Sequence, residues 1–152
     1  MKILDLLKEN HEYKVSYSAV VLDHGSRERI LNHLSIPNDW KVICHHMTIK
    51  MGELPENLKE KIGHTVTLHV TKLGKSDLAL AVGVETSLSQ NAIPHITVAI
   101  NALNGAKPKD SNAIEDWTML DEPFTVKGRI EEVMFKPPLK SQLEPTVLNV
   151  FD

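Results

Sequence analysis

Residues His46-Met47-Thr48-Ile49 and His95-Ile96-Thr97-Val98 share one order of residue types, which is histidine, apolar, threonine, apolar. Both stretches lie in segments that alternate between polar and apolar residues, a pattern typical of a β-strand with one buried face. Residues i and i+2 of a strand share a face. Each stretch is therefore predicted to present an imidazole beside a hydroxyl and to direct its apolar residues into a core.

Two such strands facing one another would form a cavity with two histidines and two threonines. Cleavage of a phosphodiester needs a base for the attacking oxygen and an acid for the leaving oxygen, and histidine suits both roles because its unperturbed pKa is about 6.5. Threonine hydroxyls can donate to the phosphoryl oxygens. One motif alone would be ordinary, since threonine favours strands and histidine is often half-buried there. The pair predicts His46, Thr48, His95 and Thr97 as a catalytic set that needs no metal.

The rest of the chain predicts an α/β domain of the α+β type, dominated by antiparallel strands. Strands are expected over residues 13–22, 41–51, 65–73, 78–85, 95–101 and 123–135, short helices over 27–34 and 54–62, and one helical turn over 110–117. The alternation on both sides of residues 74–77 predicts a hairpin. We expect one domain over residues 1–152, in which the motif strands line a central cleft and the short helices pack outside.

Both ends of the chain carry apolar residues. Residues 1–10 predict a short amphipathic helix and not a signal peptide, because they contain no continuous apolar run. Residues 137–152 are too apolar for a free tail. They are expected to pack as an edge strand or an arm, either on their own chain or on a second copy in a homo-oligomer.

Composition narrows the class of protein. With 152 residues and 41% hydrophobic content, the chain is long enough for one domain with a real core. Acidic and basic residues are interspersed and the net charge is -3, which argues against binding nucleic acid by bulk electrostatics. The single cysteine excludes a disulfide within the chain and favours the cytoplasm. No segment has transmembrane length, so no membrane partner is expected.

The paired motifs are similar to the signature of the 2H phosphoesterase superfamily. The wider sequence resembles its RNA 2′,3′-cyclic phosphodiesterases and tRNA ligase-associated domains. The stretches that carry the resemblance are Tyr17-Ser18-Ala19-Val20-Val21-Leu22-Asp23, His45-His46-Met47-Thr48-Ile49, Pro94-His95-Ile96-Thr97-Val98-Ala99 and Lys107-Pro108-Lys109-Asp110-Ser111-Asn112. The resemblance implies two lobes around a central cleft, one histidine and one threonine from each motif, and no metal or other cofactor. It also implies RNA ends or cyclic nucleotides as substrates, and an RNA ligase or kinase as a partner.

Four further residues are candidates for binding substrate. Tyr17 could stack on a base or simply pack in its strand. Lys50, expected on the face of His46, could bind phosphate or end its strand in solvent. Lys107 and Lys109 lie in a Gly/Pro loop after the second motif and could contact a phosphate or be ordinary polar loop residues.

Neighbouring polar residues have structural interpretations. His45 directly precedes His46 and is expected on the opposite face with Ile43, in the core or at an interface. Ser111 and Asn112 are expected to cap a turn, with donation to a ligand as the alternative. The eight histidines show no metal-ligand spacing on a helix, so no metal site is expected.

The sequence therefore predicts hydrolysis of a 2′,3′-cyclic phosphate on an RNA end or nucleotide. Which histidine is the base and which is the acid stays open. One alternative keeps the chemistry and changes the substrate to linear or cyclic oligonucleotide signals. Another is a non-catalytic module that binds RNA ends or assists a repair enzyme.

Overall fold

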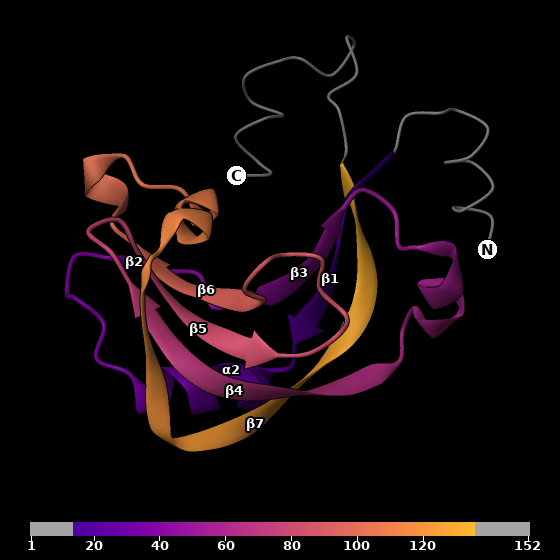
Figure 1. Cartoon of the computed structure of the whole chain (residues 1–152). Coiled ribbons are helices and arrows are strands. Elements are labelled where there is room, and N and C mark those ends of the chain that lie inside the picture. Colours follow the sequence, from indigo (N-terminus) through magenta and orange to yellow (C-terminus); the bar gives the residue numbers. More distant parts are fainter. Residues whose placement is uncertain (1–13, 136–152) are drawn as a thin grey trace, which may run out of the picture.

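The strands of this protein form one antiparallel sheet that closes on itself. The computed structural model describes residues 14–135 (Figure 1). The strand order is β2-β6-β3-β1-β7-β4-β5, and β5 also pairs with β6. The strands are β1 (Lys14–Leu22), β2 (Lys41–Val42), β3 (His46–Met51), β4 (Thr65–Lys75), β5 (Ala79–Glu85), β6 (His95–Ile100) and β7 (Asp116–Phe135). The predicted α+β class with mostly antiparallel strands is confirmed.

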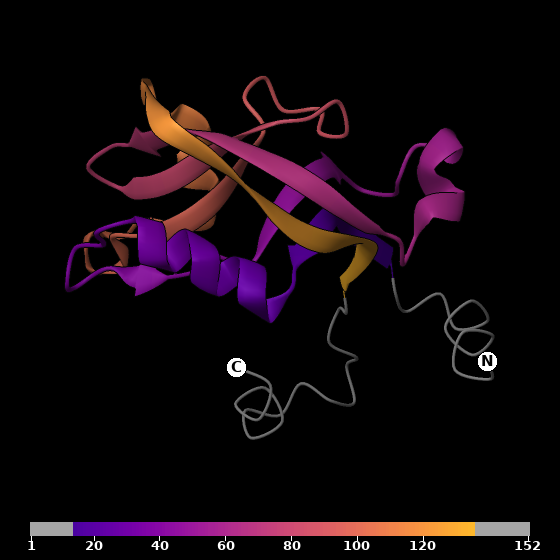
Figure 2. The ribbon, with the colours of Figure 1, turned by 90° about the horizontal axis from the view of Figure 1, so that it is seen from below.

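Helices are few and short among the described residues. They are α2 (His24–His33) and three 3-10 helices, η1 (Glu56–Lys61), η2 (Ala102–Asn104) and η3 (Pro108–Ala113). Asp23 caps α2, because its carboxylate accepts a hydrogen bond from the Ser26 amide at 2.7 Å. Ser26 Oγ in turn accepts from the Lys127 amide at 2.7 Å, which ties α2 to β7 (Figure 2). No helix within residues 14–135 is long and apolar enough to cross a membrane.

The main core lies under the motif strands. Met47 and Ile49 of β3 and Ile96 and Val98 of β6 are all fully buried. They pack in one cluster with Ile30 of α2 and with apolar residues of β1, β4, β5 and β7. The predicted division of each motif into an apolar and a polar face is therefore confirmed, and the core fixes which face of the sheet carries the polar residues.

The expected strand over residues 41–51 is broken into β2 and β3. Cys44 lies between them with a φ of 41°, in the left-handed region that few non-glycine residues adopt. The break keeps its hydrogen bonds to β6, because the Ile43 amide donates to the Val98 carbonyl at 2.8 Å and the Cys44 amide to the Thr97 carbonyl at 2.9 Å. Because of this kink, Ile43 and His45 do not lie on the face that a regular strand would give them.

The last strand is longer than expected. β7 begins at Asp116, whereas the sequence predicted a strand over 123–135 and a helical turn over 110–117, of which η3 covers the first part. Phe124 pairs with Val70 and Met119 with Lys72, so the four residues between them have no partner in β4. Pro123 is tolerated in that unpaired stretch. The helix expected over 1–10 and the arm expected over 137–152 lie outside the described residues.

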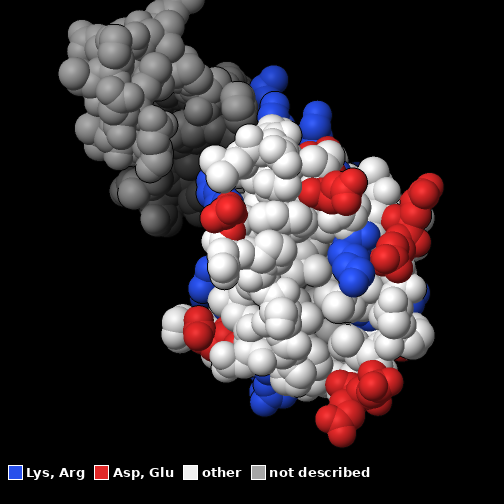
Figure 3. Space-filling view, turned by 90° about the vertical axis from the view of Figure 1, so that its left-hand side faces the viewer, with Lys and Arg blue, Asp and Glu red and all other residues white. Residues whose placement is uncertain are grey.

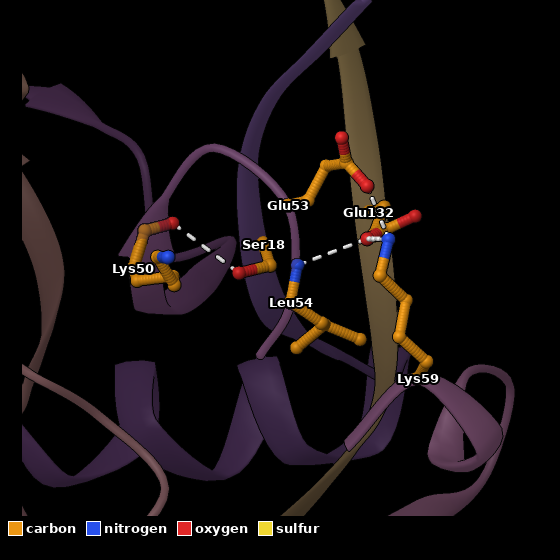
Figure 4. A network of polar contacts seen from close by, with 6 residues as sticks. All are labelled: Ser18, Lys50, Glu53, Leu54, Lys59 and Glu132. Carbon is orange, nitrogen blue, oxygen red and sulfur yellow. Dashed lines mark hydrogen bonds and ion pairs between the residues drawn. The ribbon is translucent and has the colours of Figure 1, made fainter. Parts of the chain in front are cut away.

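Polar contacts fix the chain that leaves the first motif strand (Figure 4). The Leu54 amide donates to the Glu132 carboxylate of β7 at 2.9 Å. Lys59 of η1 pairs with the same carboxylate at 3.2 Å and also with Glu53. The segment after β3 is therefore held against β7, which lies on the other side of β1 in the sheet.

Candidate active site

The two motif strands lie side by side in the sheet. Met47 pairs with Ile96 in antiparallel register, which places His46 beside Thr97 and Thr48 beside His95. The sequence suggested strands that face one another, but they are hydrogen-bonded neighbours. Their histidines occupy diagonal positions, for which the typical separation is about 7–8 Å. A phosphate group can fit between two imidazoles at that spacing.

One cavity of about 360 Å³ brings together most of the predicted site. It is lined by all four motif residues, His46, Thr48, His95 and Thr97, and also by Tyr17 and Lys109. These residues come from β1, β3, β6 and η3, so distant parts of the sequence meet at one place. The two motifs therefore share one cavity.

Two of the predicted substrate-binding residues do not line this cavity. Ser18 pairs with Lys50 and Ala19 with Thr48, so Ile49 is an extra residue that interrupts the alternation of β3. As a result Met51, and not Lys50, follows Thr48 along the cavity wall. The expectation that Lys50 shares the face of His46 and Thr48 is wrong for this reason.

The segment after β6 contains the two other candidate lysines, and one of them lines the cavity. Lys109 lines the cavity and Lys107 does not. The Lys107 amide donates to the Asp110 carboxylate at 2.7 Å, which closes the start of η3. Two further polar residues line the cavity, Asn112 of η3 and Asn91 of the loop before β6. For Asn112 the sequence favoured a turn cap, with donation to a ligand as the alternative. Asn91 had no signal in the sequence, because it lies in an ordinary polar loop.

The loop that carries Asn91 is fastened over the edge of β3. Ser89 Oγ donates to the Thr48 carbonyl at 2.8 Å, and the Gln90 amide donates to the Ile49 carbonyl at the same distance. The Asn91 amide then donates to Ser89 Oγ at 3.1 Å. The bulge in β3 leaves these carbonyls available, so the irregular strand also positions a wall of the cavity.

His46 is enclosed on two sides by aromatic rings. The Tyr17 ring stacks on it with centroids 4.9 Å apart, and His45 meets it edge-on. Burial is the main cause that lowers the pKa of His46 from its ordinary 6.5 to about 4, and the charges of His45 and His95 lower it further. Burial also raises the pKa of Tyr17. The His46 imidazole is therefore neutral at pH 7 and can accept a proton.

His45 is exposed and contacts the site, contrary to the expectation that it points away. Its Nδ1 lies 3.0 Å from Nδ1 of His46, so one of the two nitrogens donates a hydrogen bond to the other. Ile43, expected on the same far face, lines the cavity. Both corrections follow from the left-handed backbone of Cys44, which the strand pattern did not reveal.

His95 has a fixed orientation. Its Nδ1 lies 2.8 Å from the Ile93 carbonyl oxygen, and a carbonyl only accepts, so Nδ1 carries the hydrogen. The proton that can be gained or lost is then the one on Nε2. On the same strand Thr97 Oγ1 donates to Oγ of the buried Ser111 at 2.8 Å. The loop before β6 therefore orients His95, and η3 orients Thr97.

Stability should depend on pH through His46. The unfolded chain gains a proton on this side chain below about pH 6.5, and the folded protein only below about pH 4. We therefore expect the free energy of unfolding to fall as the pH is lowered from 6.5 to 4, by up to about 3 kcal/mol from this group. Above pH 6.5 it contributes no pH dependence. Urea denaturation at several pH values measures the effect, and His46→Gln should remove that part of the slope. Equal slopes for both proteins would contradict it.

No family model and no curated protein matches this chain. Among residues 14–135, no group of three or more His, Cys, Asp or Glu side chains is arranged to hold a metal ion. The cavity offers two imidazoles, two threonine hydroxyls, the phenol of Tyr17, two amides and one ammonium group. Such a set can move protons and bind a phosphate.

Proposed function

We propose that this protein is a 2H-type phosphodiesterase that hydrolyses a 2′,3′-cyclic phosphate on an RNA end or a nucleotide without a metal. The observation that carries the proposal is that both His-x-Thr pairs line one cavity, with the two histidines diagonal across neighbouring strands. We further propose that the sheet is a compact form of the two-lobed 2H arrangement. A cytoplasmic location and a partnership with an RNA ligase or kinase belong to the same proposal.

His46 acts as the base in this mechanism. It is neutral near pH 7, because its pKa is lowered to about 4. When its Nδ1 donates to Nδ1 of His45, the lone pair is on Nε2. Nε2 takes a proton from water while the water oxygen forms a bond to phosphorus. His45 is then a positioning residue that selects the reactive tautomer of His46.

His95 acts as the acid. The Ile93 carbonyl keeps Nδ1 protonated, so the protonated ring has its second proton on Nε2. As the bond from phosphorus to one ribose oxygen breaks, His95 Nε2 gives its proton to that oxygen. The product is one molecule, a ribose monophosphate whose other ribose oxygen is now a free hydroxyl group, and the proton from water ends on His46. Transfer between the two histidines through solvent restores the starting state.

The remaining polar groups hold the phosphoryl oxygens. Thr48 and Thr97 donate hydroxyl hydrogens, and Lys109 offers a positive charge at the cavity wall. Ser111 can reverse its hydrogen bond with Thr97, because a hydroxyl both donates and accepts, which frees the Thr97 hydrogen for the phosphate. Lysine, arginine, aspartate and glutamate are interspersed on the face in Figure 3. The described residues of this face therefore form no continuous basic surface along which a nucleic acid could bind.

The pH dependence of kcat/KM tests this assignment, with EDTA present throughout. The base works above about pH 4, where His46 loses its proton, and a general acid works only in its protonated form. We therefore expect a bell-shaped profile whose acidic limb lies near pH 4, well below the ordinary histidine value. An acidic limb near pH 6.5 would contradict the role of His46. Strict dependence on an added divalent metal would contradict the mechanism as a whole.

A further inference from the structure

A second cavity lies next to the first on the far side of His95. Its volume is about 270 Å³, and it shares Asn91, His95 and Asn112 with the first cavity. Trp117 of β7 forms part of its wall, and the Trp117 and His95 rings are 6.4 Å apart between centroids. A ligand whose phosphate lies between the two histidines can therefore extend past His95 toward the indole.

The Trp117 ring rests on a glycine. A Cβ atom added at Gly74 would lie 2.6 Å from Cε3, 2.6 Å from Cζ3 and 2.8 Å from Cδ2 of Trp117. A point nearly equidistant from three consecutive ring atoms lies over the face of the ring and not at its edge. One face of the indole is thus packed flat against β4, where only glycine leaves room. Gly83 of β5 is also close, since its added Cβ would lie 3.3 Å from Cζ3.

A hydrogen bond fixes the ring in that place. Trp117 Nε1 donates to the Ile114 carbonyl at 3.1 Å. The indole is half-buried against the small cluster that contains Ile114, Ala79 and Ala81. With one face on Gly74 and its nitrogen bonded, the ring cannot turn to fill the second cavity. Trp117 also lines the second cavity, so part of the ring that Gly74 does not cover borders that cavity.

We infer that the second cavity binds the nucleobase of the substrate, stacked on the part of the Trp117 ring that borders it. This rests on the function proposed above. Among the described residues, those that line the cavity include no lysine, arginine, aspartate or glutamate, which suits an uncharged planar group. The amides of Asn91 and Asn112 can each donate and accept, as the edge of a base requires. The substrate class is then a nucleotide or RNA end with its base in place, and not a sugar phosphate alone.

Matched substrates with and without a base test this inference. The two substrates are adenosine 2′,3′-cyclic phosphate and the same ribose cyclic phosphate without adenine. Each is assayed with the parent chain and with the Trp117→Leu variant. Stacking of a base on an aromatic ring is worth about 1–3 kcal/mol, so KM for the adenosine compound should rise by about 5- to 150-fold. KM for the compound without a base and kcat for both should stay within about two-fold. An equal rise in KM for both compounds would overturn the inference.

Gly74→Ala provides a second variant that removes no ligand contact. The added methyl group displaces the indole and should raise KM for the adenosine compound alone. Trp40→Phe is the matched control, because Trp40 packs against the main core away from both cavities and should leave both KM values unchanged. Melting temperatures of all variants show whether each one is folded.

Binding without turnover separates this inference from the proposed function. In the Trp40→Phe background Trp117 is the one remaining tryptophan. We expect 3′-AMP to quench its fluorescence and ribose 3′-phosphate to leave it unchanged. Quenching by 3′-AMP together with a lack of hydrolysis would support the base site and contradict the proposed phosphodiesterase. An indole that does not respond to 3′-AMP would overturn the base site whatever the activity.

Discussion

Replacement of either His46 or His95 by alanine is expected to lower kcat for a 2′,3′-cyclic nucleotide by about 10²- to 10⁴-fold. A positioned general acid or base typically speeds a reaction by about 10²- to 10⁴-fold, and each variant removes one of the two proton transfers. Both imidazoles line the cavity next to Thr48 and Thr97, which we propose hold the phosphate, so KM should change much less than kcat. Steady-state kinetics with adenosine 2′,3′-cyclic phosphate measures both quantities.

The histidines act as one unit in this account. The double variant should therefore be only slightly worse than the poorer single variant, because loss of either group already stops the concerted transfer. His69→Ala is the matched control. His69 is exposed on β4, does not line the cavity and should leave kcat unchanged. Full activity in either His46→Ala or His95→Ala would favour a binding module over an enzyme.

Met47→Ala is expected to lower the free energy of unfolding by about 2–5 kcal/mol. Met47 is fully buried, and its removal both loses transfer free energy and leaves a cavity in the main core. It is also the residue that pairs with Ile96 where the two motif strands meet. Part of the support for both histidines should be lost with it. Urea denaturation followed by circular dichroism measures the change.

Met119→Ala is the matched control for that variant. The same side chain is deleted, but Met119 is 59% exposed on β7. We expect a change within about 0.5 kcal/mol, as for most surface substitutions. A comparable loss of stability in both variants would mean that the core does not lie beneath the motif strands.

The sequence predicted the polar and apolar faces of the motif strands because those faces depend on a local rule. Alternation forces His46 and Thr48 to one side once Met47 and Ile49 are buried, and the structure buries both apolar residues. The rule extends only as far as the strand is regular. It failed at Lys50, where Ile49 forms a bulge, and at His45, where Cys44 adopts a left-handed backbone.

The pairing of the strands was not accessible from the sequence. β3 and β6 are separated in the chain by the β4–β5 hairpin, and their adjacency depends on closure of the whole sheet. No local pattern distinguishes neighbouring strands from strands that face each other. The same holds for Trp117 and Gly74, which meet because β7 pairs with β4. The second cavity therefore appears only in three dimensions.

The fate of oxygen atoms in one hydrolysis reaction tests the central claim most directly. Adenosine 2′,3′-cyclic phosphate is incubated with the protein in ¹⁸O-labelled water and EDTA, and the product is analysed by mass spectrometry and ³¹P nuclear magnetic resonance. The mechanism predicts a single regioisomer of adenosine monophosphate with one ¹⁸O atom in its phosphate, formed by the parent chain and lost in both histidine variants. No hydrolysis, or hydrolysis that both variants retain, would contradict it.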